Sequence, residues 1–506
     1  MAIEQFQTAP WKSTHEAYRK SSLAVAPAPE YASSEVLLSS LLRTIGFELP
    51  ERSVPQAGRE FEKSLSKQRD RKKKPDNATL EADIALTLFH GILETPVRPN
   101  QSARRTLQVA PIVPGIATIS GAARNSGNSW HAGGIVQRLV WLGSSDDAAA
   151  LHLWRKLFDA LTVSDRDDVF ARWLQLEVAA WANDEPKWTF RIPAPDDARI
   201  LSPADRSSIQ YPAKRFVEDL AAIIASKPYL TRRQWISLLE SVVRIAAASH
   251  VTWLCEVHGR IWGLVSGVLS HAAVPAVAEA RAAVFPTRLS YFPYGDRAMS
   301  GVDDLISQYL QARIGLNATL WFLEEAGAPF VGDMSSSQGV ASLCQHIRDN
   351  LSGDQPSQLQ SIVGEILERE ARTLLCKKGV GANMHEFIQY SLGQRQSALP
   401  ILRGYDQGYF LRKRGEHSSN PWVVALGPVS ILALVHCTLM GAGGPRSIHR
   451  LSDHLATYGI AIEPQKIGAS DLGQQLRMLG LILDSPDAES GMLLLPPFKM
   501  LGTELI

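Results

Sequence analysis

The sequence has few of the features that identify a secreted, membrane or zinc-binding protein. Its 506 residues contain four cysteines, Cys255, Cys344, Cys376 and Cys437, and no CxxC pair. Cysteines this far apart argue against a disulfide framework or a zinc motif, so we expect reduced thiols. The N-terminus has no apolar stretch behind a basic start, and no apolar run reaches the roughly 18 residues of a membrane span. We therefore expect a soluble cytoplasmic protein without membrane contact.

Catalytic motifs are also lacking. The chain has no GxxxxGK[ST] phosphate loop, no GxGxxG dinucleotide motif and no GxSxG nucleophile turn. His385-Glu386 lacks the second histidine of a zinc-protease motif. We expect no catalytic residue, no metal and no cofactor. One alternative stays open: an unrecognised enzyme with its site at residues 121–134, where Arg124, Asn125, Asn128 and His131 lie among glycines.

Charge of one sign is not in excess. Lys plus Arg number 52 and Asp plus Glu number 51, for a net charge of +1, which excludes a protein that coats nucleic acid by bulk charge. Residues 59–75 are locally basic, with eight basic residues against three acidic ones. Lys72, Lys73 and Lys74 in this run are candidate phosphate contacts. The alternative, which we favour for this run, is a solvated mobile loop.

Helical periodicity dominates what is present. Apolar residues recur at three-and-four spacing over much of the chain, and prolines gather in residues 183–212. We predict a mainly α, multi-domain protein with an N-terminal domain at 1–195, a central helical domain at 196–395 and a C-terminal domain at 396–506. The N-terminal domain is expected to contain a basic loop at 59–75 and an irregular or β-containing region within residues 97–134.

The C-terminal domain has the most readable pattern. We expect helices at 420–440, 446–458 and 470–479, with a short apolar link at 460–462. Strands at 481–483 and 492–495 follow around a polar turn. This order of helices and ribbon resembles a winged-helix domain, and SDLGQQLRMLGLILDSPDAESGMLLLPPF resembles its third helix and wing.

The winged-helix resemblance implies a helix that can enter the major groove of DNA. Gln474, Gln475 and Arg477 are then candidates for reading base edges, with Lys466 on phosphate. The wing is acidic, with Asp484, Asp487 and Glu489, and acidic side chains are repelled by phosphates. The alternative is that the module docks onto another protein.

A second basic segment, RGYDQGYFLRKRG, covers residues 403–415. Its cations Arg403, Arg412, Lys413 and Arg414 alternate with aromatic residues, a composition that suits a nucleic-acid backbone with stacked bases. A solvated turn leading into the C-terminal module explains the same composition.

RGYDQGYFLRKRG and the terminal LGLILDSPDAESGM segment also give the chain a resemblance to accessory subunits of bacterial anti-phage defence systems. The resemblance implies a non-enzymatic DNA-binding or scaffolding subunit that works with a separate ATPase, helicase or nuclease. A pure protein–protein adaptor, with the winged helix as its docking face, is the alternative. The candidate DNA contacts are Lys72, Lys73, Lys74, Arg403, Arg412, Lys413, Arg414, Lys466, Gln474, Gln475 and Arg477.

Overall fold

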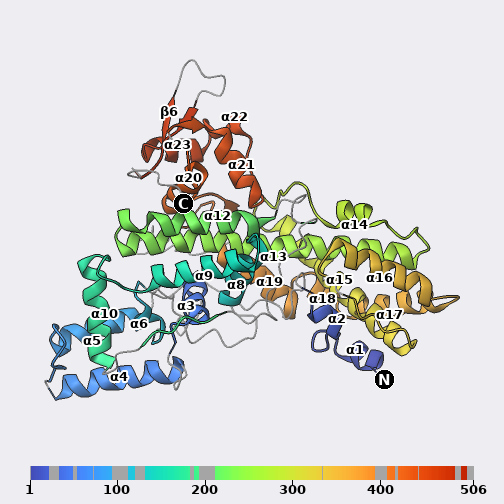
Figure 1. Ribbon diagram of the computed structural model, residues 1–506, viewed down its shortest axis with the longest axis horizontal. Helices are drawn as coiled ribbons and strands as arrows, with labels where there is room; N and C mark the ends of the chain where they lie inside the picture. Colours follow the sequence, from blue (N-terminus) through green and yellow to red (C-terminus); the bar gives the residue numbers. More distant parts are fainter. Residues whose placement is uncertain are drawn as a thin grey trace.

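The structure is a computed structural model, and its described residues are mainly helical, as predicted. It describes residues 2–21, 34–48, 54–71, 73–93, 112–119, 132–182, 187–192, 205, 211–332, 334–393, 407–415, 420–442, 444–484 and 492–498. Figure 1 shows an elongated molecule with residues 2–19 at the right-hand end, residues 54–93 at the left-hand end and the C-terminal elements rising at the top.

A 38-residue helix, α13 (Arg232–Leu269), lies at the centre of the molecule. Its first turn is closed by a capping box, in which the Thr231 side chain accepts from the backbone N–H of Gln234 and the Gln234 side chain accepts from that of Thr231. Apolar residues occur all round α13 because helices cover most of its surface. By length and composition alone it is the one described helix that could span a membrane, but 94% of its most apolar window is buried inside the protein.

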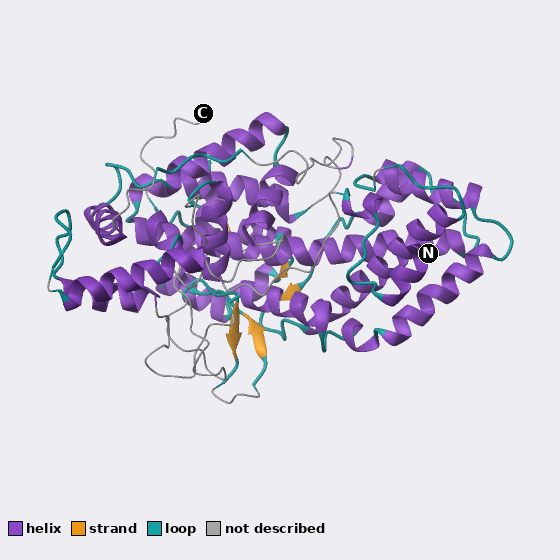
Figure 2. Ribbon diagram, turned by 90° about the horizontal axis from the view of Figure 1, so that it is seen from below, coloured by secondary structure: helices purple, strands orange, loops and turns teal. Residues whose placement is uncertain are grey.

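Most of the other helices lie beside α13 in two groups (Figures 1 and 2). One group contains α3 (Ser34–Ile45), α8 (Ala132–Gly143), α9 (Asp147–Leu161) and α12 (Pro212–Ser226), and the short turn η2 (Lys227–Tyr229) follows α12. The other group contains α1 (Ala2–Thr8), α2 (Glu16–Arg19), α14 (Val277–Val284), α15 (Ser300–Glu325), α16 (Ser337–Asn350), α17 (Gln355–Arg369), α18 (Ala371–Leu374) and α19 (Gly379–Ser391).

A smaller hydrophobic cluster forms a satellite at one end of the molecule. It unites α4 (Val54–Asp70), α5 (Ala82–Leu93), α6 (Pro114–Ala117) and α10 (Val169–Ala182). The prediction of a loop over residues 59–75 is wrong as far as Asp70, because Phe61 and Leu65 bury one side of α4 and thereby hold it helical. No strand occurs among the described residues of the first 195; residues 94–111 and 120–131 lie outside the described part.

The C-terminal elements differ from the expected ones at two places. Residues 420–440 are not one helix: strand β3 (Trp422–Val424) comes first, and α20 (Pro428–Leu439) begins at a proline in its first turn. Strand β4 (Arg446–Ser447) takes the start of the second expected helix, which is α21 (His449–Thr457). The third helix and the ribbon are confirmed; the remaining elements are β5 (Ile460–Ala461), α22 (Pro464–Ile467), α23 (Asp471–Met478), β6 (Ile482–Asp484) and β7 (Met492–Leu494).

Three small sheets occur in the described residues. Strands β4, β7 and β6 form an antiparallel sheet in that order, with Ser447 and Leu483 both opposite Leu493. Strand β2 (Leu411–Lys413) pairs with β3 in an antiparallel hairpin. Strand β1 (Phe292–Pro293) pairs in parallel with β5 and so joins the central part to the C-terminal elements.

One hydrophobic core runs through most of the chain, since Phe6, Trp253 and Leu494 belong to the same cluster of buried residues. Parts of all three expected domains therefore share one core. The division into domains at 195 and 395 stays a prediction.

Candidate macromolecular interface

Residues 428–498 are called the C-terminal unit here, and their core orients helix α23. Leu472 and Leu476 of α23 are fully buried, and the Ser470 side chain accepts the Gly473 N–H at the start of the helix (3.4 Å). Burial of one side of α23 leaves the opposite side to solvent.

The exposed side of α23 contains two of the three predicted base-reading residues. Gln474 and Arg477 are exposed, and Nη1 of Arg477 donates to the carbonyl oxygen of Gly468 (3.0 Å). Gln475 is half-buried instead, and its Oε1 is buried without a hydrogen-bond partner. Only part of the predicted set is therefore available to a partner.

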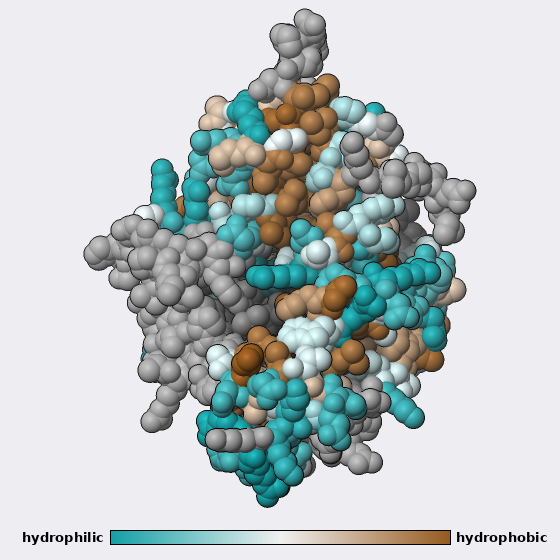
Figure 3. Space-filling model, turned by 90° about the vertical axis from the view of Figure 1, so that its left-hand side faces the viewer, coloured by the Kyte–Doolittle hydropathy of each residue, from teal (hydrophilic) through white to brown (hydrophobic). Residues whose placement is uncertain are grey.

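Two large apolar side chains are exposed on α23 and on the strand that follows it, β6. Met478 of α23 is 73% exposed and Leu483 of β6 is 51% exposed. Figure 3 shows apolar side chains gathered over the upper part of this end of the molecule, where the C-terminal unit lies. The surface of α23 and β6, which we call the α23–β6 face, is thus partly apolar.

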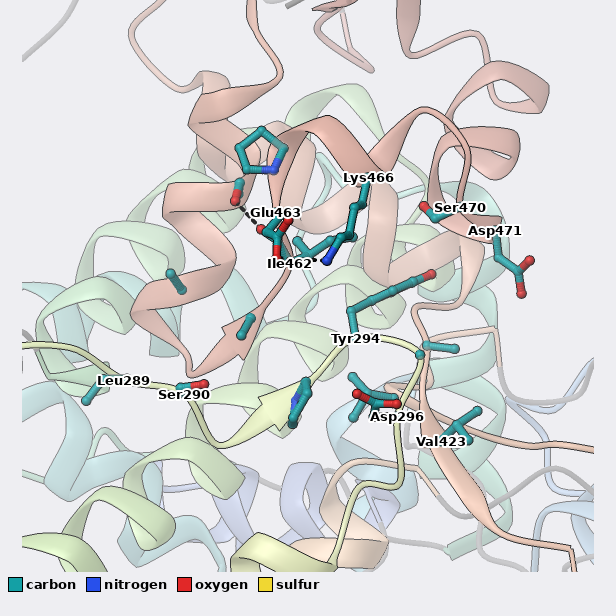
Figure 4. Close-up of a pocket in the computed structure, with 18 of the residues that line it drawn as sticks. Leu289, Ser290, Tyr294, Asp296, Val423, Ile462, Glu463, Lys466, Ser470 and Asp471 are labelled. Carbon is teal, nitrogen blue, oxygen red and sulfur yellow. Dashed lines mark hydrogen bonds and ion pairs between the residues drawn. The ribbon is translucent and has the colours of Figure 1, made fainter.

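A cleft of about 1000 Å³ separates the C-terminal unit from the segment around β1 and from the β2–β3 hairpin. Figure 4 shows Tyr294 and Asp296 on one side, with Glu463 and Lys466 on the other. Of the predicted residues, the cleft brings together Arg412, Arg414 and Lys466.

Ion pairs take up much of the basic charge in the cleft. Arg412 pairs with Asp471 at the start of α23, and Lys466 Nζ lies 2.8 Å from Glu463 Oε1. Burial alone would lower the pKa of Arg412, but its hydrogen bond to Asp471 and the charge of that carboxylate raise it. The fourth cation of the lining, Arg288, was not predicted.

The charges of the cleft lining are mixed. Its acidic residues are Asp296, Asp453, Glu463 and Asp471, which equal the four basic residues in number. Lys413, the remaining predicted residue of β2, is half-buried and lies over the Trp422 ring with Nζ 5.9 Å from the centroid.

A buried polar cluster fixes the C-terminal unit to the body. Oδ2 of Asp219, on α12, accepts from the Tyr458 hydroxyl (2.7 Å) and is 3.0 Å from His454 Nε2. None of the three side chains is more than 3% exposed. Burial and the Asp219 carboxylate raise the pKa of Tyr458 far above its ordinary value, so the phenol stays a hydrogen-bond donor. The sequence did not reveal this cluster because Asp219 is more than 230 residues away from His454 and Tyr458.

The basic run near residue 72 lies elsewhere, in the satellite. Lys73 is exposed, and Lys74 Nζ lies 2.9 Å from Glu81 Oε1. Lys72 and Arg403 lie outside the described residues, as do Arg124, Asn125, Asn128 and His131 of the alternative enzyme site. Within the described part, His, Cys, Asp and Glu side chains form no group of three or more that could hold a metal ion.

Comparison with known proteins adds no relative. No protein-family model matches the chain, and no curated protein matches its sequence.

Proposed function

We propose that this chain is a scaffolding subunit whose C-terminal unit is a winged helix that binds a protein partner through the α23–β6 face. The main support for this proposal is the order and pairing of the elements in the C-terminal unit. Helix α20, strand β4, helices α21 and α23, and the ribbon β6–β7 follow in chain order, and β4 pairs with β7 rather than β6. This order, in which β5 and α22 lie between α21 and α23, supports the proposal of a winged helix with β6 and β7 as its wing.

The composition of the α23–β6 face favours protein over DNA. A DNA-reading face needs unpaired cations for phosphates. In the neighbouring cleft Arg412 is paired with Asp471 and Lys466 with Glu463, while on the α23–β6 face Met478 and Leu483 expose apolar surface. Interfaces between proteins are enriched in methionine and depleted of charge at their centre. The two exposed apolar side chains of the α23–β6 face fit such an interface.

The class of partner follows from the resemblance to anti-phage defence subunits. We propose a cytoplasmic complex in which this chain positions a separate ATPase, helicase or nuclease. Such a role needs binding surfaces rather than catalytic groups, and it places no demand on residues 121–134.

The proposal is tested by purifying the native complex from cells with a tagged full-length chain. Met478→Asp should remove a comigrating subunit, because a charge at the centre of an apolar interface is costly to bury. Val331→Asp is the matched control, since Val331 is 91% exposed and lies outside the C-terminal unit. Hydrogen-exchange protection shows whether the Met478→Asp chain is folded normally. If the folded variant still purifies with the same subunits, the proposed docking face is wrong.

A second candidate is DNA binding at the cleft, favoured by Arg412 and Arg414 in its lining and by Lys413 between them in the sequence. Simultaneous replacement of all three by alanine should then lower DNA affinity and its salt dependence. Equal affinity and an equal salt slope in this variant would eliminate the second candidate.

A further inference from the structure

A basic ridge runs along the exposed side of α4, far from the C-terminal unit. Arg59, Lys63, Lys67 and Arg71 are four residues apart, so they follow one another on one side of the helix at a rise of about 6 Å per step. All four are exposed. Arg71 stands just beyond the last helical residue, Asp70.

The ridge is not neutralised by neighbouring carboxylates. In the described part of the chain no ion pair joins any of its four cations to an acid, whereas Asp70 pairs with Arg69 (3.1 Å). Between Arg59 and Lys74 the described residues include seven basic and three acidic side chains. Lys63, Lys67 and Arg71 line a shallow hollow of about 570 Å³, together with Ser66, Glu62 and Asp70.

Stabilisation of the helix alone does not account for this pattern. Cations near the C-terminus of a helix interact favourably with its dipole, which explains Lys67 and Arg71. The effect is confined to the last turn. Arg59 and Lys63 lie in the middle of α4, where the dipole gives no such benefit.

The surroundings of α4 favour a nucleic acid over a membrane. A helix that binds a membrane surface inserts an apolar face. The apolar face of α4 is already used, because Phe61 and Leu65 are buried in the satellite core. What α4 presents is a hydrophilic surface at the edge of the molecule, visible at the bottom of Figure 3. Duplex DNA, with one charge per roughly 1.7 Å of axis, can meet every cation of such a ridge.

We propose that α4 binds the phosphate backbone of duplex DNA through Arg59, Lys63, Lys67 and Arg71, without reading its sequence. This site is separate from the α23–β6 face. A chain with both surfaces holds DNA on α4 and a protein partner on the C-terminal unit.

The experiment measures the affinity of the full-length chain for a labelled random-sequence DNA duplex as a function of salt concentration. Four phosphate contacts give a slope of log K against log salt of about −3.6, a loss of roughly 150-fold between 50 and 200 mM salt. Lys63→Gln combined with Lys67→Gln should reduce this to about −1.8, or roughly 12-fold. The charge-matched control is Lys377→Gln with Lys378→Gln, two exposed residues between α18 and α19, and it should keep the original slope.

Three outcomes would overturn the proposal: equal slopes for the two double variants, no DNA binding by the native chain, or tighter binding to duplex RNA or to phosphatidylserine vesicles than to DNA. Met478→Asp separates this result from the proposed docking face. The variant should leave the DNA affinity and salt slope unchanged even where it removes the protein partner.

Discussion

Replacement of Asp219 by alanine should weaken the packing of the C-terminal unit on the body. The substitution leaves His454 Nε2 and the Tyr458 hydroxyl, both buried, without their shared acceptor. A buried polar group left unpaired costs about 1–3 kcal/mol, so the two together destabilise the docked unit by about 2–6 kcal/mol. Even the lower figure raises the local opening constant roughly 30-fold.

Hydrogen exchange of the amides of α21 measures this change directly, because His454 and Tyr458 both lie in or next to that helix. Glu218→Ala is the control: Glu218 precedes Asp219, is half exposed, and pairs with Arg215, an arrangement worth at most about 1 kcal/mol. If Asp219→Ala leaves exchange in α21 within a factor of about 3 of the control, the assigned role of the cluster is wrong.

Two further predictions concern pH and backbone packing. Burial holds the pKa of His250 at about 3, below its ordinary 6.5, so only the unfolded chain binds a proton in this interval. The contribution of this residue to the free energy of unfolding therefore falls by about 1.4 kcal/mol per pH unit as the pH drops from 6.5 to 3. In this interval the urea midpoint of the His250→Leu variant should depend less on pH than that of the native chain. An equal pH dependence of the two midpoints would contradict the prediction. Gly473→Ala places a Cβ against the carbonyl oxygen of Ile467, so this variant should lower the thermal stability of the C-terminal unit. At Gly364 on α17 an added Cβ meets open space. Gly364→Ala should therefore raise the stability of the protein by up to about 1 kcal/mol. A scanning calorimetry trace in which both alanine variants behave alike would refute the close contact.

Local patterns in the sequence predicted the parts of the fold that local interactions determine. Apolar spacing predicted α23, and the structure gives Gly480, just beyond it, a φ of +66°, a conformation that favours glycine. Helix α4 escaped prediction for the opposite reason. Its high charge suggested a loop, but tertiary burial of Phe61 and Leu65 holds it helical.

Long-range pairings were beyond sequence reasoning. Strand β4 has two residues and exists because β7, more than 40 residues later, supplies its partners. The ion pair between Arg412 and Asp471 joins residues that are 59 positions apart in the sequence. It partly neutralises a cation that the sequence analysis had predicted as a DNA contact. The sequence therefore predicted helix α23 better than it predicted which of its side chains are available to a partner.

Site-specific photo-cross-linking tests the central proposal most directly. A photoreactive residue at position 478 or 483 of the full-length chain, irradiated in living cells, should give a protein adduct from both positions, and the same residue at exposed Val331 should not. Adducts to nucleic acid, or adducts no more abundant than those from position 331, would contradict a protein-binding α23–β6 face.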